Sequence, residues 1–134
     1  MRTTVYPMAV ALIVVLVGVS AAAEKRMLAH DVYFSLKDSS RLAKEKLVAD
    51  CKRLLSAQAG TVWFAVGPMA EELKRDINDR DFDVALHIVF KNKAAHDQYQ
   101  KSETHLSFIA EYKERLKKVR VFDSYVEASA HSSP

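Results

Sequence analysis

The segment Tyr99-Gln-Lys-Ser-Glu-Thr-His105-Leu-Ser-Phe108 joins two amphipathic helical patterns and carries two side chains that can transfer protons. The second pattern continues through Ile109, Tyr112 and Leu116, which share one helix face with His105. This spacing predicts that the imidazole of His105 points toward the apolar side of its helix. An imidazole in that position is either a hydrogen-bonded core histidine or the working group of a small pocket.

Strand and helix patterns surround this junction in the order strand, helix, strand, strand, split helix, strand. We expect strands at residues 29–37, 61–66, 82–90 and 119–127, with a polar hairpin loop at 69–81 that is open to a short helical turn at 70–75. The first helix follows a cap at Asp38 or Ser39 and runs to about residue 58, before Gly60. The split helix covers residues 92–101 and continues, after a break at Ser102, to about 118. This order predicts an α+β fold, a ferredoxin-like βαββαβ sandwich with a four-stranded antiparallel sheet.

The N-terminus has the pattern of an export signal. Arg2 precedes an apolar run at residues 8–19, small residues at 20–23 and charged residues at 24–26. We interpret residues 1–23 as a signal peptide, which predicts a secreted or periplasmic protein. The alternative is a short membrane anchor, although a spanning helix usually needs about 20 apolar residues. Residues 28–127 then form one domain, and residues 128–134 form a polar tail expected to be disordered.

Charge and cysteine content exclude some classes of function. The net charge of +3 mixes both signs along the chain without a basic block, which argues against a nucleic-acid partner. Cys51 is the only cysteine, so the chain forms no internal disulfide. It lies on the apolar face of the first helix, where we expect a buried thiol that packs as a small hydrophobe rather than a nucleophile.

The third strand predicts a partner. From Val84 to Phe90, apolar residues occupy both faces and only His87 interrupts them. A strand that is apolar on both sides is typical of a sheet covered on both faces. Helices of this chain can cover one face only, so we expect a homodimer in which two sheets pack face to face.

Three motifs together resemble those of the stress-responsive A/B barrel domain (Dabb) family. They are the first-strand segment His30-Asp-Val-Tyr-Phe-Ser-Leu36, the Tyr-x5-His-x2-Phe helix junction, and Phe122-Asp123 in the last strand. The resemblance spans about residues 29–126 and implies a dimeric α/β barrel. Some members of this family are polyketide cyclases that close a ring by aldol chemistry. In them, the residues matching Tyr99 and His105 are the acid–base pair, and those matching His30 and Asp123 lie in or beside the pocket. The chain departs from that pattern at Ser102, where the cyclase has a second histidine followed by proline.

Strand order predicts which residues meet at the site. The first and fourth strands lie side by side and antiparallel in this fold, so Asp123 should come within hydrogen-bonding reach of His30 or His105. A carboxylate beside an imidazole fixes its tautomer and raises its basicity. We expect Tyr99 and His105 to line a common cavity whose other lining residues are His30, Val32, Phe34, Phe108 and Asp123.

The other histidines are interpreted as structural or exposed. His87 is expected to be hydrogen-bonded within its strand, His96 to lie on a solvated helix face, and His131 to lie in the tail. The five histidines and Cys51 show no metal-ligand spacing, and no motif calls for haem, so the sequence predicts no metal site and no cofactor.

Two functions remain open at this stage. The first is an exported, homodimeric stress-response protein that binds a small apolar molecule between sheet and helices. The second is a small enzyme on the same scaffold. It would be a cyclase or lyase that uses Tyr99 and His105 as acid and base, or a monooxygenase.

Overall fold

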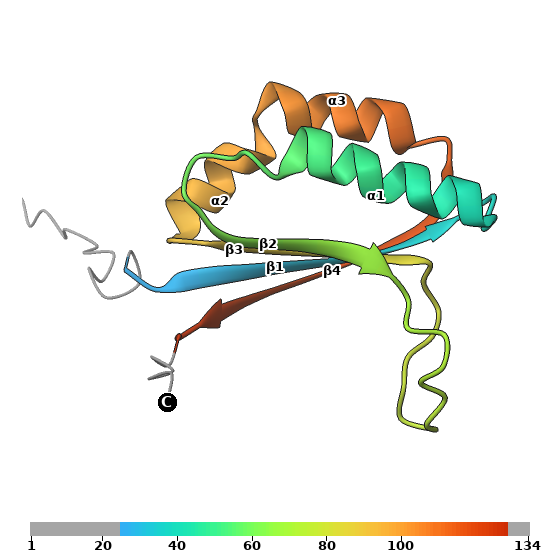
Figure 1. The fold of residues 1–134 in the computed structure, drawn as a ribbon. Helices are drawn as coiled ribbons and strands as arrows, with labels where there is room; N and C mark the ends of the chain where they lie inside the picture. The colour runs from blue at the N-terminus through green and yellow to red at the C-terminus, as the bar shows by residue number, and fades with distance from the viewer. Residues whose placement is uncertain (1–24, 129–134) are drawn as a thin grey trace, which may run out of the picture.

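The computed structural model of the chain describes residues 25–128. They form a four-stranded antiparallel sheet and three helices, which confirms the expected ferredoxin-like α+β fold (Figure 1). In chain order the elements are β1 (Met27–Leu36), α1 (Arg41–Leu55), β2 (Thr61–Pro68), β3 (Val84–Phe90), α2 (Lys93–Gln100), α3 (Glu103–Tyr112) and β4 (Leu116–Val126). The expected leader at 1–23, and the tail beyond residue 128 with His131, lie outside the described residues.

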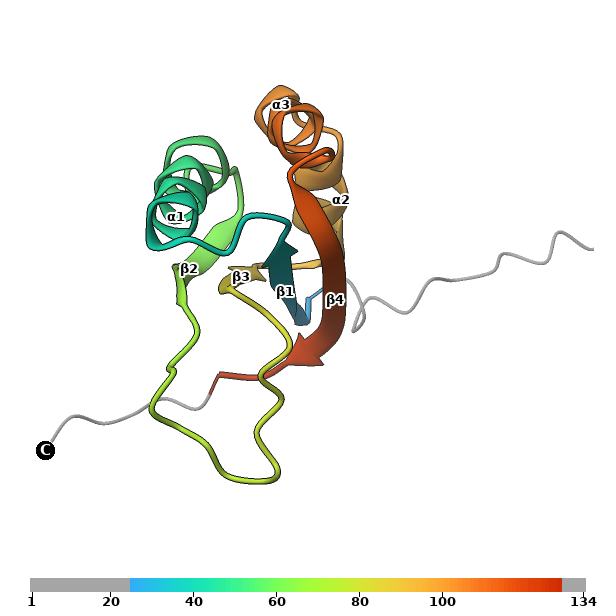
Figure 2. The same cartoon turned by 90° about the vertical axis from the view of Figure 1, so that its right-hand side faces the viewer.

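The molecule has two layers. The strands are ordered β2-β3-β1-β4, and all three helices lie on the same face of the sheet (Figure 1). Seen end-on, α1 covers the β2 side of that face, whereas α2 and α3 cover the β4 side (Figure 2). None of the helices in residues 25–128 is long and apolar enough to cross a membrane.

Short polar side chains begin each helix. Ser40, Asn92 and Ser102 accept hydrogen bonds from the free backbone N–H groups of the first turns of α1, α2 and α3. The expectation of Asp38 or Ser39 as the first cap was wrong. The Asp38 carboxylate instead accepts from the backbone N–H of Ser40, and the Ser39 hydroxyl donates to Asp83.

Helix α1 also ends earlier than expected, at Leu55 rather than near residue 58. The chain turns back toward the sheet through Gly60, whose φ of 82° favours glycine. A side chain at Gly60 would also collide with helix α2, because an added Cβ would lie 2.6 Å from the Cβ of Ala95.

The boundary between α3 and β4 corrects the sequence interpretation. The helix ends at Tyr112 rather than near residue 118, and β4 begins at Leu116 rather than Val119. Leu116 pairs with Leu36 of β1, and the N–H of Lys37 donates to the carbonyl of Arg115 over 2.9 Å. Helical periodicity placed Leu116 on the core side, and it packs there as a strand residue. The pattern therefore did not distinguish the two conformations.

Strand β3 begins at Val84 rather than Phe82. Just before the strand, the carboxylate of Asp83 accepts a 2.7 Å hydrogen bond from the backbone N–H of Leu36, and the backbone N–H of Asp83 donates to the carbonyl of Phe34 over 2.7 Å. The loop before it contains no helix at residues 70–75, only a turn closed by the Leu73 N–H and the Ala70 carbonyl.

The core lies between the sheet and the helices. Alternate residues of β3 face the helices and are fully buried, together with apolar residues of α1; they are Val84, Leu86, Ile88, Phe90, Leu47, Cys51 and Leu55. Burial raises the pKa of the Cys51 thiol to about 12, so the thiol stays neutral and packs as a small hydrophobe, as expected.

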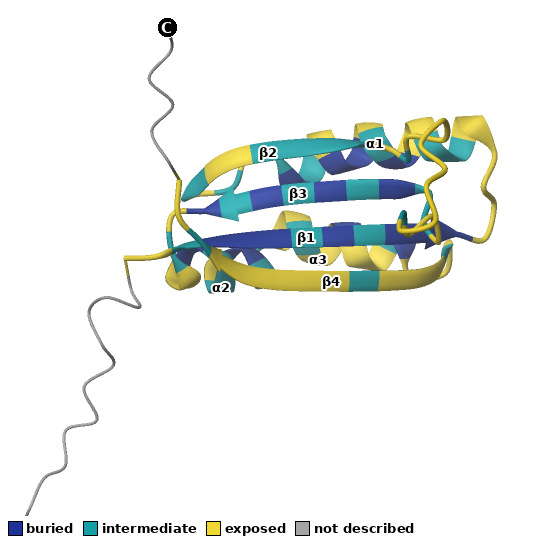
Figure 3. Ribbon diagram, turned by 90° about the horizontal axis from the view of Figure 1, so that it is seen from below, coloured by how far each residue is buried: buried dark blue, intermediate teal, exposed yellow. Residues whose placement is uncertain are grey.

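The opposite face of the sheet carries no helix among the described residues (Figure 3). It presents aromatic rings, including Trp63 at 55% and Phe122 at 53% exposure. The loop between β2 and β3 extends below one end of this face (Figure 1), and an ion pair of 2.6 Å between Asp81 and Lys118 ties it to β4. A large part of the apolar surface of this face stays open.

Candidate functional site

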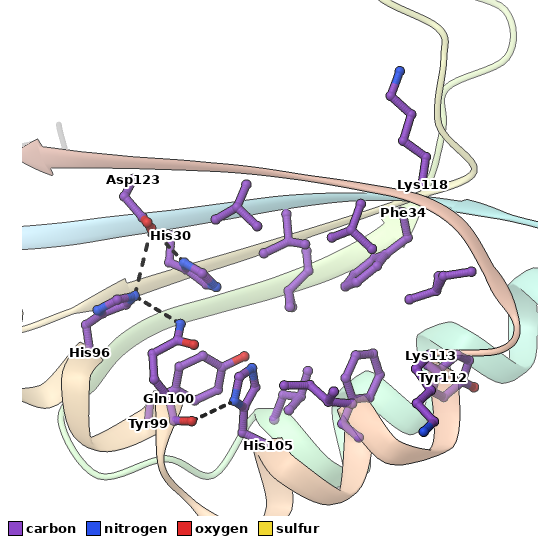
Figure 4. A pocket seen from close by; sticks show the side chains of 18 of the residues that line it. His30, Phe34, His96, Tyr99, Gln100, His105, Tyr112, Lys113, Lys118 and Asp123 are labelled. Atoms are coloured by element: carbon purple, nitrogen blue, oxygen red, sulfur yellow. Dashed lines mark hydrogen bonds and ion pairs between the residues drawn. The ribbon is translucent and has the colours of Figure 1, made fainter.

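A cavity of about 650 Å³ lies between the helix-covered face of the sheet and helices α2 and α3 (Figure 4). We call it the helix–sheet cavity. The imidazoles of His30 and His96 and the carboxylate of Asp123 line one end, which we call the polar end. Lys113 and Lys118 lie toward the other end (Figure 4). All seven residues that the sequence suggested for the site line this cavity: His30, Val32, Phe34, Tyr99, His105, Phe108 and Asp123.

His30 and Asp123 form a pair at the polar end. They stand directly opposite each other in the antiparallel register of β1 and β4, which places both side chains on the helix-covered face. The Nδ1 of His30 lies 2.7 Å from Oδ1 of Asp123. An ionised carboxylate only accepts hydrogen bonds, so Nδ1 carries the proton and donates. Burial lowers the pKa of His30 below its usual value, and the Asp123 carboxylate opposes that shift only in part.

His105 lies in the first turn of α3, where the Ser102 cap accepts from its backbone N–H. Its Nδ1 lies 3.1 Å from the backbone carbonyl of Gln100. Because a carbonyl only accepts, Nδ1 must donate, and the lone pair is then on Nε2. Burial lowers the pKa of His105, and the hydrogen bond to Gln100 offsets this in part. The ring is therefore neutral at pH 7 and can accept a proton at Nε2.

Tyr99 lies on the last turn of α2 and is 2% exposed. Its ring centroid is 4.4 Å from that of His105 and 5.7 Å from that of His30. The hydroxyl is directed into the cavity beside the His105 ring (Figure 4). Burial raises the pKa of Tyr99, which keeps the phenol protonated and able to donate a hydrogen bond.

His96 is the residue that sequence reasoning missed. We expected it on a solvated helix face, but its side chain is 14% exposed and lines the helix–sheet cavity. Its ring lies 5.1 Å from that of His30 and 5.6 Å from that of Phe90. The available signal was its spacing of three residues from Tyr99, which places both on neighbouring positions of one helix face.

Apolar side chains form the middle of the cavity. Val32 and Phe34 extend from β1, and Phe108 of α3 meets Phe34 with ring centroids 5.8 Å apart. Aromatic and aliphatic walls of this kind suit an apolar ligand, and the imidazoles and the phenol at one end of the cavity can form hydrogen bonds.

His87 does not contribute to this cavity. It lies on the open face of the sheet, where its Nδ1 is 2.6 Å from Oδ1 of Asp31, and Trp63 lies beside its ring. The hydrogen-bonded role expected for His87 agrees with this geometry.

The family model of the stress-responsive A/B barrel domain (Dabb) matches residues 28–126. The chain belongs to this family. The sequence therefore identified the family from its three motifs, over nearly the same residues. No protein with a curated description matches the chain.

Solved structures share the fold. A Dabb-family protein with a ferredoxin-like fold from Mesorhizobium loti is 25% identical, with a TM-score of 0.64 over 78% of this chain and 99% of that one. A hydroxynitrile lyase from Passiflora edulis is 19% identical, with a TM-score of 0.63 over 79% of this chain and 98% of that one. A dimeric ferredoxin-like protein of unknown function from Thermobifida fusca is 14% identical, with a TM-score of 0.63 over 77% and 93%.

Proposed function

We propose that this protein binds a small, largely apolar molecule in the helix–sheet cavity. The observation that carries this proposal is the cavity itself, because its volume of about 650 Å³ lies within the range of small-molecule sites, roughly 300–1,000 Å³. Its apolar walls would bury the body of the ligand. His105, Tyr99 and His30 at the polar end would hold an oxygen-bearing group such as a carbonyl or hydroxyl.

A fluorescent probe tests this binding without knowledge of the natural ligand. The fluorescence of 1-anilinonaphthalene-8-sulfonate should rise with saturation as it enters the cavity. Ile109 of α3 lines the cavity, so the larger ring of Ile109→Trp narrows it. Ile109 is 46% exposed, so the substitution does not overpack the core. This variant should weaken probe binding roughly tenfold, or about 1.4 kcal/mol.

Leu106→Trp is the matched control. Leu106 lies on the same helix with 53% exposure but does not line the cavity, so its replacement should leave probe binding unchanged. Equal effects of the two variants would locate the probe elsewhere and contradict the proposal. In a separate experiment, native mass spectrometry of protein from its own compartment would identify a retained natural ligand.

The second candidate is an enzyme that uses the same cavity for acid–base chemistry. The observation that favours it is the fixed tautomer of His105, whose free Nε2 lies next to the protonated phenol of Tyr99. The imidazole would remove a proton next to a carbonyl, and Tyr99 would donate a hydrogen bond to the developing enolate. The hydroxynitrile lyase among the structural neighbours shows that this fold can carry an enzyme.

His105→Gln and Tyr99→Phe separate these two candidates. If the protein only binds a ligand, the wild type should show no turnover. Both variants should then fold and keep most of their affinity for the fluorescent probe. If it is an enzyme, each variant should lower kcat by about 10²-fold or more with little change in KM. Melting of the protein on either change would instead identify a structural role for that residue.

We further propose that the mature protein is exported and dimeric. Export rests on the leader pattern of residues 1–23, with cleavage near Ala23. Intact-mass measurement should find an N-terminus at or close to Glu24, whereas a full-length mass in the membrane fraction would favour an anchor.

Dimerisation is supported by the uncovered aromatic face of the sheet and by dimeric neighbours with the same fold.

A further inference from the structure

His30, His96 and Asp123 meet at the polar end of the helix–sheet cavity, although they come from three separate elements, β1, α2 and β4 (Figure 4). Each offers one ligand atom, and these atoms all lie within 4.8 Å of one another. The Nδ1 of His30 is 2.7 Å, and the Nε2 of His96 is 3.9 Å, from the same Oδ1 of Asp123. We call this group the His–His–Asp cluster.

We propose that the His–His–Asp cluster binds one divalent transition-metal ion, such as Zn²⁺, at the end of the cavity. Two imidazoles and a carboxylate are a ligand set that zinc, iron and cobalt accept. With metal–ligand bonds of about 2.0–2.1 Å, neighbouring ligand atoms stand roughly 2.8–3.0 Å apart in octahedral sites and roughly 3.3–3.4 Å apart in tetrahedral sites. The distances of 2.7 and 3.9 Å bracket both ranges, so small side-chain rotations would close the site.

The surroundings of His96 orient it for this role. Its Nδ1 lies 3.4 Å from Oδ1 of Asp97, whose other oxygen is paired with Lys93 at 2.5 Å. The carboxylate holds the proton on Nδ1 and leaves the Nε2 lone pair facing the cluster, as carboxylates behind metal-binding histidines do. That lone pair now accepts a 3.1 Å hydrogen bond from the amide of Gln100, which a metal ion would replace.

The other two ligands also satisfy the chemistry. His30 donates its Nδ1 proton to Asp123 in the empty cluster, and the proton would move to Nε2 when Nδ1 binds a metal ion. Two neutral imidazoles and one carboxylate carry a charge of −1, which favours a cation. Two paired strands and a helix fix the backbone positions of the three residues, so binding requires only rotations of their side chains.

Three protein ligands leave at least one coordination position open. That position would face the cavity that Tyr99 and His105 also line. A water or a ligand oxygen could occupy it, as in zinc sites with three protein ligands. The inference does not depend on the proposed apolar ligand, because the cluster is complete without one.

Zinc and cobalt titrations of the untagged full chain, stripped with a chelator, test the site. We expect one Zn²⁺ per chain by isothermal titration calorimetry, and intense visible absorption of Co²⁺ if the site is four-coordinate. His96→Gln and Asp123→Asn should each weaken Zn²⁺ binding at least tenfold while the circular dichroism spectrum stays unchanged.

The His87 and Asp31 pair supplies the control. It has a similar hydrogen bond of 2.6 Å on the opposite face of the sheet but belongs to no cluster of three ligands among the described residues. His87→Gln should leave Zn²⁺ binding unchanged. Stoichiometric binding that persists in both His96→Gln and Asp123→Asn, or no binding below millimolar Zn²⁺, would overturn the inference. Continued probe binding in that case would leave the proposed apolar site intact.

Discussion

The imidazole of His105 and the backbone carbonyl of Gln100 lie 3.1 Å apart across the junction of α2 and α3. This contact determines which ring nitrogen faces the helix–sheet cavity. A carbonyl cannot donate, so the ring holds its proton on Nδ1 and presents Nε2 as an acceptor. The break between the two helices thus positions the cavity's candidate base.

The tautomer and pKa of His105 can be measured directly. Nitrogen-15 NMR should show a protonated Nδ1 and a free Nε2 at pH 7.5, and the ring should titrate below 6.5 because burial lowers its pKa. Since the folded pKa is below the unfolded one, protonation of His105 favours unfolding as the pH falls through that range. A titration midpoint above 6.5 would contradict the burial argument.

Tyr112 is expected to stabilise the packing of α3 on α1. Its hydroxyl donates to Oδ2 of Asp50 over 2.5 Å in the core between these helices. Tyr112→Phe should lower the free energy of unfolding by about 1–3 kcal/mol, because a buried hydrogen bond to a charged group is lost. Urea denaturation measures this. Tyr125→Phe, at an exposed position, should change stability little.

Asp50 should make the fold sensitive to acid. Burial raises the pKa of Asp50, but hydrogen bonds from Lys46, Tyr112 and Arg53 outweigh it and hold the pKa at about 2. The folded pKa is below the usual 3.8, so the carboxylate stabilises the fold above that pH. We expect a loss of roughly 1–2 kcal/mol as the pH falls from about 4 toward 2, after allowance for solvent screening.

Comparison with Asp50→Asn isolates this group from the other carboxylates. The variant should be less stable at pH 6, and its stability should fall less steeply below pH 4 than that of the wild type. Parallel stability curves for the two proteins would show that Asp50 has an ordinary pKa.

The open face of the sheet should be the dimer interface. Analytical ultracentrifugation at micromolar concentration should show one species of about twice the monomer mass. Trp63→Glu places a charge on this face, where Trp63 is 55% exposed, and should weaken dimerisation roughly tenfold or more. Leu106→Glu, on the outer surface of α3, should leave the dimer intact. A monomeric wild type would mean that another partner covers this face.

Local patterns explain why much of the fold could be predicted. The apolar run of β3, the break at Ser102 and the apolar stripe of α3 each report a short-range preference, and the structure has a strand, a helix cap and a partly buried helix face at these positions. The same patterns failed at residues 113–118. An apolar residue such as Leu116 suits the core in a helix or a strand, and only its pairing with Leu36 decides between them.

The sequence by itself determined the order of the elements, the face of α3 that carries His105 and the family of the chain. Strand order left the partner of Asp123 open between His30 and His105, and only the tertiary structure decided that it is His30 and that His96 joins them. His30 and Asp123 are 93 residues apart and touch because β1 and β4 pair in one register. His96 joins them because α2 packs on the sheet beside this pair, which brings its ring to 5.1 Å from that of His30. Periodicity reports which side of an element is buried, whereas the neighbours of a buried side chain depend on pairing and packing between distant segments.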